Sequence, residues 1–249
     1  MRTLRYLGSA SLASLAVLLG LMAVAVAPLP AFATTCGSTS VSNWHVGWKT
    51  DRAHTSRTDI YGVYARIDVQ QAGQCTGGSN KFSNVYAMLH DDLSQSSLGW
   101  AQSGFEKDPV NGVRNFAQVA SSVGLYTWYS ANPIPVNQAN DYKSFIAQIP
   151  GGVVGSYVNG DVKVASATSG WDSPYELEYS GESRYRESDI PGVLTDHVVI
   201  NLNQFYSSNT WSWQSTPCGI FDTYNQSPNH WYKNETSCTQ RHLWTDPTN

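Results

Sequence analysis

The sequence predicts an all-β protein in which two antiparallel sheets pack face to face as a β-sandwich or jelly roll. Tyr, Trp, Thr, Ser, Asn and Gly are plentiful while only 14% of the residues are charged, and this mixture favours strands and turns over helices. Short segments that read as strands recur along the chain, and turn-forming pairs such as Asn-Gly and Asn-Pro separate them. Many short strands with evenly spaced turns are typical of sandwiches and jelly rolls.

The chain begins with the features of an exported protein. Arg2 and Arg5 precede an apolar, alanine-rich stretch that ends in prolines and in the A-x-A pattern of residues 31–33. A positive start, an apolar core and small residues before a cleavage point define a secretory signal peptide. The apolar core is short for a membrane span, and no second apolar run follows it. We therefore expect residues 1–33 to be cleaved after Ala33, the protein to be secreted to the extracellular space, and no stable membrane anchor.

Residues 34–249 are enough for one domain with a well-developed core. Once Arg2 and Arg5 are removed from the 15 basic residues, the 19 acidic residues leave a net charge of −6. A mildly acidic surface argues against nucleic acid and against an anionic membrane as partners. We expect a monomer whose partner is an extracellular polypeptide or polysaccharide.

The predicted elements follow one another closely. Residues 34–58 are polar and rich in turn formers, and they predict an N-terminal arm with one strand near 41–48. The sandwich domain is predicted over residues 59–204. Asn159-Gly160 is the strongest hairpin signal, because this pair adopts the positive φ angles of a tight turn. The strands predicted within the domain cover 60–70, 83–90, 98–106, 115–120, 125–130, 143–149, 153–158, 162–167, 175–183 and 197–202.

Residues 205–249 are polar and rich in Trp and Asn, and they predict a C-terminal tail that packs on the sandwich and is stapled by a disulfide. All four cysteines follow the signal segment, and an even number in an oxidising compartment predicts two disulfides. Of the three possible pairings we favour Cys36–Cys75 and Cys218–Cys238, because each closes a modest local loop. A zinc site is the alternative, but the chain contains no C-x-x-C pattern.

Common catalytic patterns are absent from the sequence. The chain has no G-x-S-x-G, no S-x-x-K and no H-E-x-x-H pattern. A Ser/His/Asp triad stays open, because its members need not be close in sequence. His90, Asp91 and Asp92 could hold a cation at a strand end, but such a cluster is more often a solvated turn. We therefore predict no metal and no cofactor.

The segment 175–184 carries the most chemical information. Read as a strand, it sends Glu176, Glu178 and Glu182 to one face and apolar side chains such as Leu177 to the other. Neighbouring carboxylates repel one another, which raises the pKa of one of them and suits general acid–base work. By itself, an ordinary solvated sheet face is the simpler interpretation of this segment.

Three ordered stretches of the chain resemble the eqolisin-type glutamic peptidases. A strand at 85–91 leads to WAQSGF at 100–105, which stands where the family has "LQTGV" with its catalytic glutamine. LYTWYSANP at 125–133 stands in the place of "WYEWYP", and 175–183 in the place of "AEWIVED", whose second glutamate is catalytic. The resemblance covers about 83–202 and implies a concanavalin-like sandwich of two antiparallel sheets. It departs from the family where Thr127 replaces an acidic residue and where Gly181 replaces an aliphatic one.

The resemblance implies a secreted endopeptidase that works in acid through Gln102 and Glu182. Glu182 would take a proton from the attacking water and return it to the leaving amine. The NH₂ group of Gln102 would donate to the developing oxyanion. The predicted substrate-binding residues are Trp100, Tyr126, Trp128 and Glu178, although core packing is a competing role for the aromatic ones.

Two other functions stay open at this point. Double-sheet jelly rolls are common lectin scaffolds, and the many Trp and Tyr residues could stack on sugars, so a carbohydrate-binding module without catalysis is the main alternative. A glycosidase could use Glu178 and Glu182 as its two carboxylates. On a regular strand these two residues are about 13 Å apart, which is too far for either usual glycosidase geometry unless a bulge at Gly181 intervenes.

Overall fold

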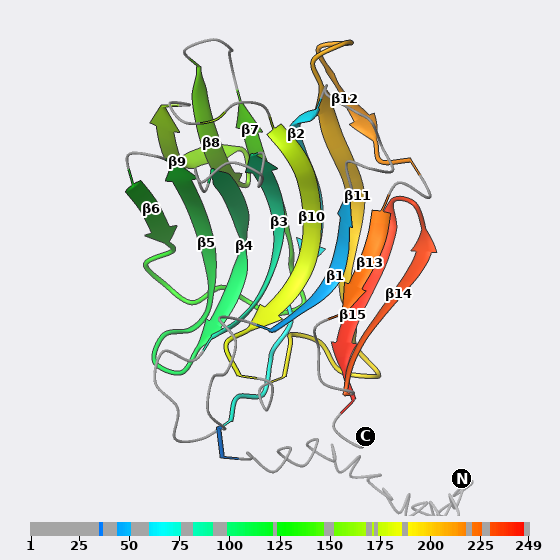
Figure 1. Cartoon of the computed structure of the whole chain (residues 1–249). Coiled ribbons are helices and arrows are strands. Elements are labelled where there is room, and N and C mark those ends of the chain that lie inside the picture. Colours follow the sequence, from blue (N-terminus) through cyan, green and yellow to red (C-terminus); the bar gives the residue numbers. More distant parts are fainter. Residues whose placement is uncertain are drawn as a thin grey trace, which may run out of the picture.

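The computed structural model describes residues 35–36, 44–50, 60–75, 82–91, 99–121, 124–146, 152–167, 171, 174–185, 189–217, 221–225 and 230–246. The regular secondary structure in these ranges consists of β-strands (Figure 1). Within the same ranges, no helix has the length and the apolar character that a membrane span requires. The predicted signal peptide, residues 1–33, lies outside the described residues.

Seven strands form the first sheet, in the order β13-β1-β10-β3-β4-β5-β6, and every neighbouring pair is antiparallel (Figure 1). Its β10 strand therefore lies between two strands, β1 and β3, that come much earlier in the chain. The bounds of these strands are β1 (Trp44–Thr50), β3 (Ser83–Asp91), β4 (Trp100–Asp108), β5 (Gly112–Ser121), β6 (Gly124–Tyr129), β10 (Pro174–Ser183) and β13 (Phe221–Asn225).

Eight strands form the second sheet, in the order β14-β15-β11-β2-β7-β8-β9, with β12 paired to β11. The bounds are β2 (Ile60–Asp68), β7 (Ala139–Ile146), β8 (Val153–Val158), β9 (Asp161–Ala167), β11 (Val198–Ser207), β12 (Ser212–Ser215), β14 (Trp231–Ser237) and β15 (Gln240–Thr245). The predicted all-β fold of two antiparallel sheets is confirmed.

The core lies between the two sheets and is built from alternate residues of each strand. On the first sheet, Val85 and Leu89 of β3 and Leu177 of β10 are fully buried. On the second sheet, Val63 and Ile67 of β2 are fully buried in the same cluster. Removal of these apolar side chains from water is the main force that holds the sheets together.

A buried hydroxyl also connects the two sheets. The side chain of Tyr179 enters the core from β10, and its hydroxyl lies 3.1 Å from the carbonyl oxygen of Gln204 on β11. The same hydroxyl lies 3.3 Å from the carbonyl oxygen of Tyr64 on β2. The polar end of this buried ring is thus satisfied by backbone groups of the opposite sheet, which fixes how β10 sits over β2 and β11.

The strands predicted between residues 60 and 202 are all present, although several ends differ by a few residues. The predicted hairpin is present too: Asn159 and Gly160 have φ angles of 52° and 87°, and Val158 pairs with Asp161. The one strand predicted in the N-terminal arm corresponds to β1, which lies inside the first sheet rather than beside it.

Residues after 205 supply strands to both sheets, where the sequence predicted a packed tail. β13 pairs with β1 at the edge of the first sheet, while β15 pairs with β11 and extends the second. The predicted Cys36–Cys75 disulfide is confirmed. Cys238 is disulfide-bonded, and its predicted partner Cys218 lies outside the described residues.

Candidate active site

A cleft of about 520 Å³ lies on the face of the first sheet that points away from the core. Because neighbouring residues of a strand point to opposite faces, the residues that line it alternate with the core residues of the same strands. The lining residues are His45 of β1, Asn84, Tyr86, Met88 and His90 of β3, Trp100, Gln102 and Glu106 of β4, Gln118 of β5, Leu125 and Tyr129 of β6, Glu182 of β10, and Phe82.

Strand register arranges these side chains in rows across the sheet. Glu178, Met88, Gln102 and Gln118 are direct neighbours on β10, β3, β4 and β5, and we call them the central row. In this row Gln102 and Glu178 are separated only by Met88. Two strand spacings correspond to about 10 Å between their Cα atoms, so their side chains can approach one another over Met88.

A second row crosses the same face four residues farther along the strands. It contains Glu182, Asn84 and Glu106, again as direct neighbours on β10, β3 and β4, and we call it the acidic row. Gln102 and Glu182 therefore share one face but not one row. Four residues along a strand span about 13 Å, and β3 lies between β4 and β10 as well.

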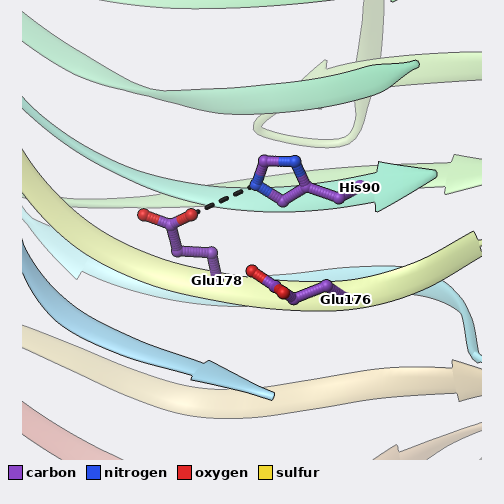
Figure 2. A group of neighbouring side chains, drawn as sticks. All are labelled: His90, Glu176 and Glu178. Carbon is purple, nitrogen blue, oxygen red and sulfur yellow. Dashed lines mark hydrogen bonds and ion pairs between the residues drawn. The ribbon is translucent and has the colours of Figure 1, made fainter. Parts of the chain in front are cut away.

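Glu178 is held by two aromatic side chains from β3. The hydroxyl of Tyr86 donates a hydrogen bond of 2.7 Å to Glu178 Oε1. His90 Nε2 lies 3.1 Å from Glu178 Oε2, and Figure 2 shows the two side chains pointing toward one another from adjacent strands. Only 6% of the Glu178 side chain is exposed, so this carboxylate has a fixed position beside the cleft.

The Gln102 amide is also fixed. Its Nε2 donates a hydrogen bond of 2.5 Å to Gln118 Oε1 in the central row. A primary amide has two N–H donors, so this bond leaves one of them free to serve a ligand in the cleft.

The imidazole of His45 also lies beside the cleft, and its Nδ1 atom is 3.4 Å from the Tyr86 hydroxyl. Burial lowers the pKa of His45. The charge of Glu178 opposes this shift, and His90 reinforces it.

The two carboxyl groups of the acidic row hold their protons unusually well. Burial raises the pKa of Glu182 to about 8, and repulsion by Glu178 adds to this, while a hydrogen bond from Asn84 opposes it. Burial also raises the pKa of Glu106 to about 7, with Asp108 adding to the shift and Arg114 opposing it. Both groups are therefore protonated in acid.

Three side chains near the cleft could together hold a metal ion. His90, Glu176 and Glu178 each offer a ligand atom, and these atoms all lie within 4.8 Å of one another (Figure 2). A cation already faces this group, because Lys49 Nζ lies 3.8 Å from Glu176 Oε1. The sequence grouped His90 with Asp91 and Asp92 as a possible cation site. In the structure the acidic residues grouped with His90 are Glu176 and Glu178 of β10 instead. Asp91 is buried, and Asp92 lies outside the described residues.

The structure brings together only part of the predicted site. Trp100, Gln102 and Glu182 line the cleft, and Glu178 lies beside it. Tyr126 and Trp128 are not among the lining residues, because they occupy the alternate positions of β6.

Trp128 packs instead against the main core, and Lys163 Nζ lies 5.1 Å from the centre of its ring. Leu125 and Tyr129 line the cleft from the same strand. Sequence reasoning also missed Asn84 and Glu106, which only the pairing of distant strands places beside Glu182.

No protein-family model matches the chain, and no curated protein matches it in sequence. A crystal structure of scytalido-glutamic peptidase with a peptide-based transition state analog matches at a TM-score of 0.54 and 12% identity, over 82% of this chain and 98% of that one. A second structure of that peptidase, with a transition state analog inhibitor, matches over the same shares at a TM-score of 0.52 and 13% identity.

SCP-B, a member of the eqolisin family of peptidases in complex with the tripeptide Ala-Ile-His, matches at 14% identity over 82% of this chain and 98% of that one. Its TM-score of 0.48 is too low to carry an argument. The same holds for polysaccharide hydrolases, with TM-scores from 0.28 to 0.32. The resemblance to the glutamic peptidases is confirmed at the level of the fold: the chain has the two-sheet fold of scytalido-glutamic peptidase.

Proposed function

We propose that the protein is a secreted endopeptidase of the glutamic type, which hydrolyses peptide bonds in acid through a glutamine and a glutamate. One observation carries the proposal: Gln102 shares the central row with a buried glutamate, beside an aromatic-lined cleft of about 520 Å³. Such a cleft suits an extended polypeptide, and the fold shared with scytalido-glutamic peptidase supports the same reaction class.

Two glutamates compete for the role of general base. Glu182 is the match that the sequence motif selects, but its pKa of about 8 keeps it protonated in acid, where it could not accept a proton. Glu178 lies in the row of Gln102 and accepts a hydrogen bond from Tyr86, a contact that stabilises a carboxylate. We therefore assign the base to Glu178 and keep Glu182 as the alternative that the experiment decides.

The proposed reaction needs few groups. A water molecule between Glu178 and Gln102 gives a proton to the carboxylate as its oxygen bonds to the scissile carbonyl carbon. The free N–H of Gln102 donates to the oxyanion that forms, a contribution commonly worth about 3 kcal/mol. The bond from carbon to nitrogen then breaks, and the proton held by Glu178 passes to the leaving amine.

The test is cleavage of denatured casein between pH 2 and pH 7 by the purified protein and by single variants. We expect activity in acid, a loss of about 1,000-fold or more in Glu178→Gln, and a loss of about 100-fold in Gln102→Ala. Glu182→Gln should lose far less than Glu178→Gln, and Asp161→Asn on an exposed hairpin serves as the control. Loss in Glu182→Gln with full activity in Glu178→Gln would move the base to Glu182. A wild-type protein that cleaves nothing would overturn the proposal.

Carbohydrate binding is the second candidate, and one observation favours it. On the outer face of the second sheet, the ring of Trp213 lies 5.4 Å from Tyr206, 5.9 Å from Phe145 and 6.1 Å from Tyr64. Aromatic clusters of this kind stack on sugar rings. A pull-down with insoluble cell-wall and plant glycans tests it: binding that Trp213→Ala abolishes would support this candidate, and the absence of binding would remove it.

A further inference from the structure

Three hydrogen-bond acceptors lie side by side at one end of the cleft. The side chains of Glu182, Asn84 and Glu106 form the acidic row, and these residues are 6%, 4% and 9% exposed. All three line the cleft, so a ligand in the cleft can reach them. With Glu178 as the general base, the proposed peptide hydrolysis uses none of them.

One acceptor of this row, the side-chain carbonyl of Asn84, lacks a donor. The side chain of Asn84 forms a hydrogen bond with Glu182, yet its Oδ1 atom is buried and has no hydrogen-bond partner in the described part of the chain. A buried carbonyl oxygen without a donor is costly, and native proteins rarely leave one unless a ligand or water serves it. The carbonyl of Asn84 therefore marks the place where a donor from outside the protein is expected.

The cation that the protein places next to this row, Arg114, is held by other partners. Across β1, His45 is the direct neighbour of Glu182, and burial lowers its pKa, so this ring is neutral near pH 7. Arg114 is the neighbour of Glu106 on β5, but its guanidinium pairs with Asp108 and lies over the ring of Tyr129. Among the described residues, no ion pair joins Glu106 or Glu182 to a basic side chain.

We propose that the acidic row is a specificity subsite that binds the ammonium group of a lysine side chain in the substrate. An ammonium has three N–H donors, and the row offers three acceptors: two carboxylates and the unpaired carbonyl oxygen of Asn84. A cation between Glu182 and Glu106 also cancels their mutual repulsion in a buried site, where charges interact strongly. This inference rests on the proposed function, since it concerns the same cleft.

The position of the subsite follows from the strand geometry. The acidic row lies about 13 Å along the strands from the central row, and an extended peptide advances about 3.3 Å per residue. A lysine side chain itself covers several of those ångströms, so the lysine lies two to four residues from the scissile bond. Tyr86, which lines the cleft, packs with the buried Phe116 between the two rows, so an apolar residue next to the lysine would meet an aromatic ring there.

The lysine preference depends on pH. The groups that face the two carboxyls are His45, Glu178, Asp108, Arg114, Tyr129 and Asn84. Burial and the neighbouring acids keep Glu182 and Glu106 protonated in acid, so they attract a cation fully only as pH approaches 7 to 8. The preference for lysine therefore increases from acid toward neutral pH.

The test measures binding without turnover. We would titrate the Glu178→Gln protein with octapeptides whose ends are capped and whose other residues are uncharged. A single lysine is moved through each position, and each peptide is compared with a matched peptide that has norleucine at that position. At pH 7.5 we expect about tenfold tighter binding for lysine at one position, and no preference at pH 4. Adding Glu106→Gln or Glu182→Gln should abolish the preference; these amides resemble the protonated carboxyls, so the fold is kept. Asp161→Asn is the control.

Each outcome bears on one proposal at a time. Equal binding of lysine and norleucine peptides, or a preference that survives both glutamine variants, would overturn the subsite. Tighter binding of arginine than of lysine peptides would overturn the ammonium assignment. A lysine preference in a protein that never cleaves casein would keep the subsite and remove the peptidase. Cleavage of casein by the wild type, together with equal binding of lysine and norleucine peptides at pH 7.5, would keep the peptidase and remove the subsite.

Discussion

The two carboxyl groups of the acidic row link the stability of the protein to pH. Burial raises the pKa of Glu182 to about 8 and that of Glu106 to about 7, from an ordinary value of 4.5. Between pH 4.5 and these values, the folded chain binds more protons than the unfolded chain. The free energy of unfolding therefore falls as pH rises through this window, and the contribution is fully present only below pH 4.5.

We expect the melting temperature of the wild type to fall by several degrees more than that of the Glu106→Gln, Glu182→Gln double variant between pH 4.5 and pH 8. The amides do not titrate, so the difference between the proteins isolates these two groups from other carboxyls with raised pKa values, such as Asp68 and Asp189. Calorimetry at half-unit pH steps measures it. Parallel melting curves for both proteins would contradict the assignment.

Tyr86 is a positioning residue for Glu178. Its hydroxyl donates the 2.7 Å hydrogen bond that fixes this carboxylate, and it does not reach the reacting atoms in the proposed reaction. Tyr86→Phe removes only the hydroxyl. Since a hydrogen bond to a charged group is worth about 1.5 to 3 kcal/mol, we expect kcat to fall about 10-fold to 150-fold with KM nearly unchanged. Steady-state kinetics on a peptide substrate measures both, and a change confined to KM would mean that Tyr86 only binds substrate.

At the scale of single strands, the alternation of polar and apolar residues predicted which side chains face the cleft on β10 but not on β6. The sequence placed Glu178 and Glu182 on one face of β10, and both are on the face of the cleft because Leu177 and Tyr179 fill the core. β6 carries large side chains at successive positions, so alternation could not tell which of them face the cleft. Pairing with β5 decides this, and it turns Leu125 and Tyr129 inward to the cleft.

The register between β4 and β10 could not be predicted from the sequence. It decides that Glu178, rather than Glu182, shares a row with Gln102, and it depends on β3 pairing correctly with both strands. No local pattern encodes a pairing between segments so far apart in the chain. The β14 strand was missed for another reason: it exposes most of its side chains, so little apolar alternation marks it.

Gly104 allows β3 and β4 to approach closely beside the central row. A Cβ atom at this position would lie 2.0 Å from the carbonyl oxygen of Val85, and backbone atoms cannot move aside cheaply. We expect Gly104→Ala to lower the stability by about 3 kcal/mol, or roughly 6 to 12 °C. Gly160→Ala, at a turn with φ of 87° and open space around it, should cost only about 1 kcal/mol. Thermal unfolding of both variants tests the contrast, and equal losses would contradict it.

At the scale of the whole molecule, one disulfide ties the segment before β1 to the connection between β2 and β3. Cys36 precedes β1 of the first sheet, and Cys75 follows β2 of the second. The bond closes a loop with a sequence separation of 39. A loop of this size reduces the entropy of the unfolded chain by an amount worth up to about 4 kcal/mol.

Replacing both Cys36 and Cys75 with serine should lower the free energy of unfolding by about 2 to 4 kcal/mol without changing the cleft. The measurement is equilibrium unfolding in urea, with the midpoint and the slope reported separately. An unchanged midpoint would show that the crosslink does not constrain the unfolded chain. Lost casein cleavage at full stability would show instead that the disulfide shapes the site.

The insertion of β10 between β1 and β3 has a consequence for how the protein is made. The strand that carries Glu178 and Glu182 pairs with segments that left the ribosome about 90 to 130 residues earlier. Until residue 183 has emerged, β1 and β3 lack the strand that pairs with both of them, and Glu178 and Glu182 are not in place. The earlier strands therefore cannot form the cleft. The proposed peptidase is therefore inert while the first 183 of its 249 residues are being made, which protects the cell that synthesises it over roughly the first three quarters of the chain.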